Sequence, residues 1–231
     1  MAGRPLTIGA EIDKCDGVLY AFHGGTMAGP ALSDLIFGRV NPSGKLPVTF
    51  PKMVGQVPIY YNQKLTGRPA GDDAVLLKDI PVEAKQTSLG FSSYWLEVGY
   101  KPLYPFGYGL SYTTFEYNKI QVSNPVLSKN GSIEVWCEVK NTGTREGQEV
   151  VQLYVQDVAG SSTRPCRELK GFQKVTIAPG ETQTVSFTIT PDMLAFYHAA
   201  DGKSYAEPGS FNVWIASSSD TGLESHFMLE E

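Results

Sequence analysis

Residues 133–140 read IEVWCEVK, and their pattern predicts how the longer part of the chain folds. Ile133, Val135, Cys137 and Val139 alternate with side chains that are mostly polar. Successive side chains of a β-strand point to opposite faces of the sheet, so this alternation predicts a strand with one buried face.

The same period of two recurs further along the chain. The stretches that carry it are VQLYVQ at 151–156, TVSFTI at 184–189 and FNVWIA at 211–216. Turn residues lie between them, for example APGE at 178–181. Short alternating strands separated by turns are typical of an antiparallel β-sandwich. We therefore expect a sandwich of the immunoglobulin or fibronectin type III kind over residues 115–231.

The amino-terminal residues follow a different pattern. Residues 16–22, DGVLYAF, form a continuous apolar run like that of a strand buried on both faces, and a glycine loop follows them. Apolar residues between Met27 and Phe37 then recur at helical spacing. A strand, a glycine loop and a helix make half of a crossover unit in a parallel sheet. We therefore expect residues 1–62 to be a partial α/β sandwich domain, cut from a larger one.

The ends of the expected helix carry recognisable signals. Thr26 is a candidate N-cap, and Pro30 falls in the first turn, where a missing N–H is tolerated. Gly38 follows the last apolar residue, as a C-terminal residue of left-handed conformation often does. The apolar face of the helix is expected to consist of Met27, Ala31, Leu32, Leu35 and Ile36.

Residues 63–114 follow neither pattern. The stretch TGRPAGDD at 66–73 is polar and rich in turn residues, whereas PLYPFGYGLSY at 102–112 is rich in aromatic side chains. Aromatic rings interleaved with Gly and Pro favour a segment that packs on a neighbouring surface. We expect residues 63–114 to be a linker and docking segment, with 106–109 packing between two domains. Stacking of these rings on a sugar is the alternative.

Composition excludes several classes of protein. The chain has 231 residues and a net charge of −5, which argues against a nucleic-acid partner. It holds no run of about 18 apolar residues, so no membrane-spanning helix is expected. The histidines and cysteines are scattered without ligand spacing, so neither a metal site nor a cofactor is expected.

The three cysteines leave two alternatives open. Cys137 and Cys166 could pair in an oxidising compartment, or all three could be unpaired thiols. Residues 1–8 are too short to hold a signal peptide. We therefore expect either a cytoplasmic chain or one whose natural amino terminus lies further upstream.

Three strings are more specific than composition. They are GRVNPSGKLPVTFP at 38–51, LYPFGYGLSYT at 103–113, and ELKGFQKV at 168–175 followed by PGET at 179–182. In this order and spacing, they resemble the carboxy-terminal part of glycoside hydrolase family 3. The strings VGQVPIYY at 54–61 and TGRP at 66–69 are most similar to the periplasmic bacterial β-glucosidases of that family.

The resemblance implies an enzyme built of a (β/α)₈ barrel, an α/β sandwich and a fibronectin type III-like domain. Retaining glycoside hydrolysis uses two carboxyl groups about 5–5.5 Å apart. The resemblance places the nucleophilic Asp in the barrel and the acid/base Glu ahead of Met1. No catalytic residue is therefore expected in this chain, which should be inactive alone.

The acidic side chains of the early part of the chain are expected to be solvated surface groups. Glu83 and Glu97 are kept as alternatives for the acid/base, because the position of that residue varies within the family. The acidic residues weighed are Glu11, Asp13, Asp16, Asp34, Asp72, Asp73, Asp79, Glu83 and Glu97.

Substrate contact is expected at Tyr60, Tyr61, Arg68 and Trp95, because aromatic rings stack on sugar faces and Arg donates to hydroxyls. The implied parent is a periplasmic or secreted β-glucosidase or β-xylosidase that acts on a β-linked glucoside or oligosaccharide. Its missing barrel is the implied partner, and a homo-oligomer is left open. The alternatives are a stand-alone carbohydrate- or protein-binding module that uses Trp95 or Trp214, and a chain that complements a separate barrel subunit.

Overall fold

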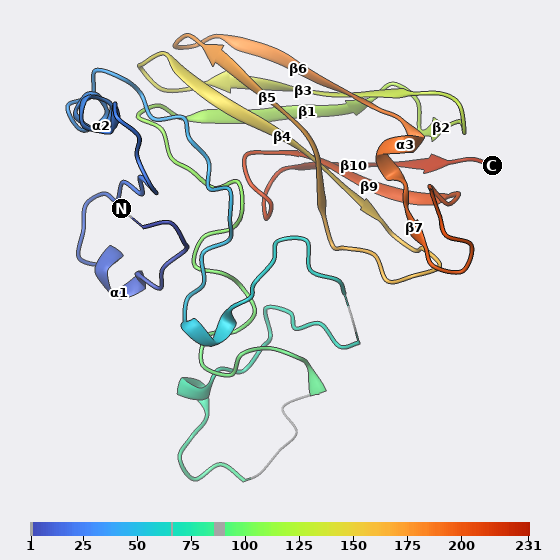
Figure 1. Cartoon of the computed structure of the whole chain (residues 1–231), viewed down its shortest axis with the longest axis horizontal. Helices are drawn as coiled ribbons and strands as arrows, with labels where there is room; N and C mark the ends of the chain where they lie inside the picture. The colour runs from blue at the N-terminus through green and yellow to red at the C-terminus, as the bar shows by residue number, and fades with distance from the viewer. Residues whose placement is uncertain (1, 66, 86–90) are drawn as a thin grey trace.

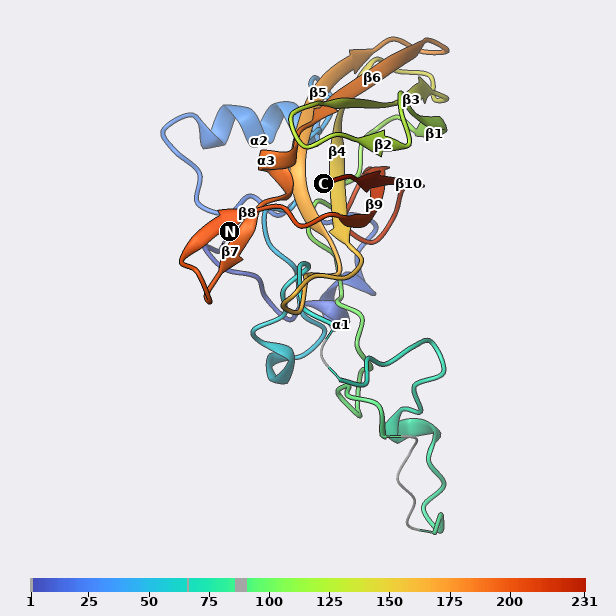
Figure 2. The same ribbon diagram turned by 90° about the vertical axis from the view of Figure 1, so that its right-hand side faces the viewer.

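The computed structural model describes residues 2–65, 67–85 and 91–231. Two β-sheets pack face to face into a sandwich, and the amino-terminal residues and a long loop lie outside it, as Figure 1 and Figure 2 show. One sheet has the strand order β1-β3-β6 and the other the order β2-β10-β9-β4-β5. Neighbouring strands are antiparallel except for the short parallel pair β2 and β10.

The strands of the sandwich are β1 (Phe115–Val122), β2 (Val126–Leu127), β3 (Ile133–Asn141), β4 (Gly147–Asp157), β5 (Glu168–Ile177), β6 (Thr182–Ile189), β9 (Gly209–Ala216) and β10 (Leu223–Leu229). Between β6 and β9 lie helix α3 (Pro191–Leu194) and a small hairpin of β7 (Phe196–His198) and β8 (Lys203–Tyr205). The earlier elements are α1 (Gly9–Ile12), α2 (Ala28–Ile36) and the 3-10 turns η1 (Val54–Gln56) and η2 (Leu77–Asp79). Within the described ranges, none of the helices has the length and apolar character that a membrane crossing requires.

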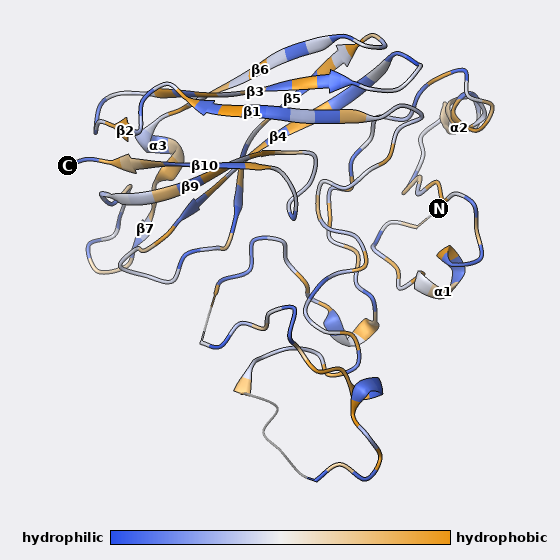
Figure 3. Cartoon of the chain, turned by 180° about the vertical axis from the view of Figure 1, so that it is seen from behind, coloured by the Kyte–Doolittle hydropathy of each residue, from blue (hydrophilic) through white to orange (hydrophobic). Residues whose placement is uncertain are grey.

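The core of the sandwich lies between the two sheets and follows the alternation of the sequence. Ile133, Val135, Cys137 and Val139 of β3 are at most 2% exposed. Figure 3 shows hydrophobic and hydrophilic residues alternating along the strands. The other strands complete this core with Val151, Leu153, Val155, Val185, Phe187, Ile189, Phe211, Val213 and Ile215. The expected mainly β fold is therefore confirmed.

Strands β4 and β9 are buried on both faces, which simple alternation does not predict. Tyr154 and Trp214 point away from the main core, yet they are 0% and 5% exposed. With Ala216 they form a second cluster, against which Tyr61 and Phe106 pack. Tyr61 and the docking segment therefore cover the part of the outer face that β4 and β9 form.

The strand predicted at residues 16–22 is wrong. These residues adopt no strand conformation, and Val18 and Leu19 are 52% and 47% exposed. A strand needs a neighbour that satisfies its backbone N–H and C=O groups, and the described residues provide none beside this run. The side chains instead pack locally, with Tyr20 in edge-on contact with both Phe22 and Phe50.

The predicted helix forms as α2, with Pro30 in its first turn. Gly38 has a φ of +68°, and the backbone N–H groups of Gly38 and Arg39 donate to the carbonyls of Leu35 and Asp34. These bonds make the expected left-handed C-terminal motif. The prediction for the other end is wrong, because Met27 rather than Thr26 is the N-cap and no side chain caps the helix.

The expected apolar face of α2 is largely uncovered. Met27 and Ile36 are 68% and 66% exposed, and Phe37 beyond the helix end is 76% exposed. The helix contacts the rest of the chain mainly through its carboxyl end, so its apolar side chains are not part of the core described above.

Two segments that are distant in sequence run side by side between α2 and the sandwich. Phe50 and Tyr104 exchange backbone hydrogen bonds of 2.8 and 3.3 Å. Four residues away on each segment, Leu46 donates to the carbonyl of Tyr108 at 2.8 Å. The chain between these points therefore leaves and returns at one place. Residues 61–64 contact the sandwich, whereas Figures 1 and 2 show the later residues projecting away from it. We call residues 67–85 and 91–101 the projecting loop.

The cysteines are unpaired in the structure. Cys15 is exposed, Cys137 is buried in β3, and Cys166 is half-buried. The thiol of Cys166 donates to the backbone carbonyl of Tyr61 at 3.3 Å. Of the two alternatives, the structure supports free thiols.

We expect a thiol reagent at about pH 8 to modify Cys15 first and Cys137 only after unfolding. Burial raises the pKa of the Cys137 thiol to about 12, and burial also raises the pKa of Cys166. Little reactive thiolate therefore forms at either position. Thiols are counted without reductant in native and denatured chains, and all three should react after unfolding. A denatured count of one would mean that Cys137 and Cys166 are paired.

Candidate functional site

The four residues expected to contact substrate have different surroundings. Tyr60 is 64% exposed. The guanidinium of Arg68 lies 5.1 Å from the ring centroid of Phe91, on the projecting loop. The indole Nε1 of Trp95 donates to the backbone carbonyl of Gly55 at 2.7 Å and so fastens the loop to η1. Thr66, the first residue of the TGRP string that contains Arg68, lies outside the described residues.

Tyr61 lies at the junction of the docking segment with the sandwich. Its ring stacks on Phe106 with centroids 4.3 Å apart, and it meets Tyr154 edge-on at 6.0 Å. The backbone N–H of Leu169 donates to the Tyr61 hydroxyl at 3.2 Å. One face of the Tyr61 ring is thus occupied by Phe106. The ring packing expected at 106–109 is seen at Phe106.

A buried amide holds this junction from the sandwich side. Gln152 is 3% exposed, and its side-chain NH₂ donates to the carbonyls of Gly107 at 3.1 Å and Ser217 at 2.7 Å. The Tyr154 hydroxyl donates to the side-chain carbonyl oxygen of Gln152 at 2.5 Å. Gly107 has a φ of +80°, and a Cβ there would lie 2.1 Å from that oxygen. Only glycine lets the segment approach so closely.

A buried ion pair fixes the segment at a second point. The Lys45 ammonium lies 3.1 Å from the Glu149 carboxylate, and their side chains are 12% and 4% exposed. Lys45 also donates to the carbonyl of Gly109, and the Tyr117 hydroxyl donates to Glu149 at 2.8 Å. Burial and the nearby Glu149 raise the pKa of Tyr117, so its hydroxyl keeps the proton that it donates.

Polar contacts also fasten the end of α2 to the sandwich. The Arg145 guanidinium donates to the carbonyl of Gly38 at 2.6 Å, and the Tyr112 hydroxyl donates to the carbonyl of Leu35 at 2.7 Å. Asn41 accepts from Ser111 and Tyr112 through its side-chain oxygen and donates to Glu146. The end of the helix is therefore joined to the sandwich by directional hydrogen bonds.

The projecting loop has polar contacts of its own. The Asp72 carboxylate lies 2.6 Å from the Lys101 ammonium and accepts from the Tyr100 hydroxyl at 3.0 Å. These bonds lower the pKa of Asp72, which keeps its charge. Of the acidic residues weighed above, all but the half-buried Asp34 are exposed. Among the described residues, no three His, Cys, Asp or Glu side chains gather as metal ligands would.

Sequence reasoning missed Gln152, Glu149 and Tyr154 as the residues that hold the junction. A usable signal was present, because Glu149 and Gln152 are polar residues beside Val150, Val151 and Leu153 in one strand. Such residues in a central strand often bind another segment, since a buried polar group needs a partner.

Comparison with known proteins identifies the family. Residues 1–112 match the glycosyl hydrolase family 3 C-terminal domain. The chain belongs to glycoside hydrolase family 3. Residues 149–219 of this family 3 chain match the fibronectin type III-like domain, which confirms the kind of sandwich expected.

Relatives of the family 3 chain align along most of its length. It is 43% identical over 229 residues to the periplasmic beta-glucosidase of Salmonella typhimurium, covering 99% of the chain and 28% of the relative. It is 44% identical over 208 residues to thermostable beta-glucosidase B of Acetivibrio thermocellus, covering 90% of the chain and 26% of the relative. The chain thus spans less than a third of the length of these proteins.

Solved structures give the same picture. The beta-glucosidase of Listeria innocua in complex with gluconolactone superposes on the family 3 chain with a TM-score of 0.87 at 35% identity, over 100% of the chain and 30% of that protein. Beta-glucosidase 3B of Thermotoga neapolitana in complex with glycerol superposes with a TM-score of 0.74 at 33% identity.

Proposed function

We propose that this chain is the carboxy-terminal part of a β-glucosidase that removes terminal β-D-glucosyl residues from non-reducing ends. The observation that carries the proposal is identity of 43% and 44% to two beta-glucosidases along 99% and 90% of the chain. The periplasmic relative supports a periplasmic location for the whole protein.

In this proposal the catalytic carboxylates belong to the part of the enzyme that the chain does not span. The sandwich and residues 102–114 form the base, and the projecting loop is the part that reaches the substrate. Tyr60, Arg68 and Trp95 are the proposed contacts. Tyr61 is the weaker candidate, since Phe106 already covers one face of its ring.

A β-xylosidase is the second candidate, because a beta-xylosidase of Formosa agariphila is 39% identical over 94% of the chain. The two substrates differ by the hydroxymethyl group of glucose. A pocket that merely accommodates or excludes such a group discriminates by about 10–200-fold. The ratio of rates on the two aryl glycosides therefore decides between the candidates.

A chimera tests the proposal directly. The part of the Salmonella relative that precedes the aligned region is joined to this chain and assayed on p-nitrophenyl β-glucoside, where we expect hydrolysis. The 231-residue chain alone should give no turnover above a denatured control. Arg68→Ala in the chimera should lower kcat/KM by about 10- to 100-fold, as expected for loss of a charge-assisted hydrogen bond.

Two controls make the test interpretable. Lys174→Ala removes a positive charge from an exposed position on β5 and should leave kcat/KM unchanged. p-Nitrophenyl β-xyloside is assayed in parallel. A folded chimera that hydrolyses the xyloside and spares the glucoside would replace the first candidate by the second, and one that hydrolyses neither would contradict both.

A further inference from the structure

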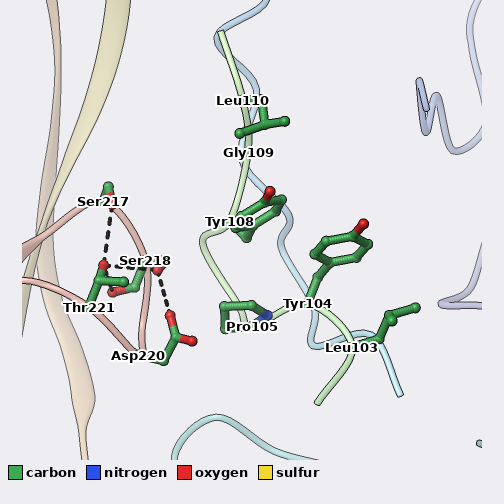
Figure 4. Close-up of a pocket in the computed structure, with 10 residues that line it drawn as sticks. All are labelled: Leu103, Tyr104, Pro105, Tyr108, Gly109, Leu110, Ser217, Ser218, Asp220 and Thr221. Carbon is green, nitrogen blue, oxygen red and sulfur yellow. Dashed lines mark hydrogen bonds between the residues drawn. The ribbon is translucent and has the colours of Figure 1, made fainter. Parts of the chain in front are cut away.

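A pocket opens between the docking segment and the turn that joins β9 to β10. Its volume is about 410 Å³, which is in the range of small-molecule sites. Figure 4 shows Tyr104, Pro105 and Tyr108 on one side and Ser218, Asp220 and Thr221 on the other. We call these six residues the junction pocket. None of the four residues proposed above to contact substrate lines it.

The docking segment contributes an aromatic wall. The rings of Tyr104 and Tyr108 are stacked with centroids 4.8 Å apart and planes within 20°. Both side chains are half-buried, and Pro105 between them is buried. Partial burial and the charge of Asp220 raise the pKa of Tyr108, so its hydroxyl remains protonated. The wall therefore offers apolar ring surface bordered by hydroxyl groups.

The turn contributes a polar wall. The Ser218 hydroxyl donates to Asp220 Oδ1 at 2.8 Å and lies 3.0 Å from the Thr221 hydroxyl. Asp220 is exposed, and its Oδ2 has no hydrogen-bond partner among the described residues. A carboxylate accepts hydrogen bonds only, whereas a serine or threonine hydroxyl can donate and accept. Such a set suits a ligand with several hydroxyl groups.

Hydrogen bonds join the two walls to each other and hold the turn. The backbone N–H of Ser219 donates to the carbonyl of Phe106 at 2.9 Å. Gln152 bonds to Gly107 on the segment and to Ser217 on the turn, as described above. The Arg167 guanidinium, stacked on Trp214, donates to the carbonyls of Ser219 and Thr221 at 2.8 Å. The pocket is therefore formed before any ligand arrives, which lowers the cost of binding.

The chemistry of the lining selects the class of ligand. The residues that line the pocket include no Lys, Arg or His, and Asp220 is acidic, so an anionic ligand is disfavoured. A neutral pyranose presents C–H groups on a ring face and hydroxyl groups around its edge, which match the two walls. We propose that the junction pocket binds a pyranose unit of a neutral oligosaccharide.

The test uses the full 231-residue chain and cellobiose as the probe, followed by amide chemical shifts in NMR. We expect saturable shifts at Tyr104, Tyr108 and 217–221, with a dissociation constant on the order of 1 mM. Tyr108→Ala and Asp220→Ala should each weaken binding by about tenfold. Tyr197→Ala removes a 65% exposed tyrosine from the β7 strand and serves as the matched control.

Tyr108→Ala removes a ring that packs in the docking segment and so can disturb the local structure. Asp220→Ala changes an exposed side chain and leaves this packing intact. The proposal is overturned if cellobiose shifts none of these amides, or if both variants bind as the parent does. Shifts with a proline-rich peptide and none with cellobiose would assign the pocket to a protein ligand and also overturn it. The readout does not depend on hydrolysis, so it is independent of the proposed β-glucosidase activity.

Discussion

Lys45→Met is expected to lower the free energy of unfolding of the chain by about 3–5 kcal/mol. The substitution keeps the length of the side chain but removes the ammonium group. It leaves the Glu149 carboxylate, whose side chain is 4% exposed, without its counter-charge. Among the described residues, only the Tyr117 hydroxyl would still donate a hydrogen bond to the Glu149 carboxylate. Urea unfolding followed by tryptophan fluorescence measures the change.

Two further variants separate burial from charge. Lys119→Met breaks the exposed pair with Glu138, whose side chains are 67% and 35% exposed, and should cost less than about 1 kcal/mol. The double variant Lys45→Met with Glu149→Leu should recover much of the loss, because an apolar pair replaces a buried ionic one. Equal effects of Lys45→Met and Lys119→Met would show that the Lys45–Glu149 pair is not buried in solution.

Gly107→Ala is expected to detach the docking segment from the sandwich, at a cost of about 3 kcal/mol or more. A methyl group at this φ of +80° is strained, and it would lie 2.1 Å from Gln152 Oε1. Gln152 would have to move and would lose its bonds to Gly107 and Ser217. Urea unfolding gives the loss of stability, and limited proteolysis should show faster cleavage within residues 40–112.

The chain offers a matched control for Gly107. Gly180 has a similar φ of +78°, but a Cβ there would meet no atom within 4 Å. Gly180→Ala should therefore cost only the backbone strain, about 1–2 kcal/mol. The difference between the two variants measures the steric contact with Gln152. If the two substitutions were equally costly, the close approach of the docking segment to β4 would be contradicted.

The sequence was sufficient to predict the inner faces of the sandwich. A period of two in the sequence shows which side chains point inward. Val135 and Val213, for example, are both buried as this period predicts. The same period could not show that Tyr154 and Trp214 on the outer face are also buried. That depends on Tyr61 and Phe106, which lie far away in the chain, and alternation within a strand carries no information about such partners.

The errors at the amino-terminal end have a related cause. The apolar run at 16–22 has the composition of a buried strand, yet a strand exists only where a neighbouring strand pairs with it. The helix at 28–36 forms its backbone hydrogen bonds within itself and needs no neighbouring strand, which is why the prediction of a helix was confirmed. For the candidate site, the sequence pointed to Arg68 and Trp95 by residue type, but the Lys45–Glu149 pair, 104 residues apart, required the structure.

The backbone contact between Phe50 and Tyr104 has a consequence for how this protein can change. Because Phe50 and Tyr104 hold the two ends of the segment together, the length of its outer part does not affect the packing of the sandwich. Doubling the length of such a loop costs only about 0.6 kcal/mol of closure entropy. Segments of different length and sequence can therefore be exchanged within residues 67–101, beyond the contacts of Tyr61, Gln63 and Lys64 with the sandwich. One scaffold can in this way carry many different loops.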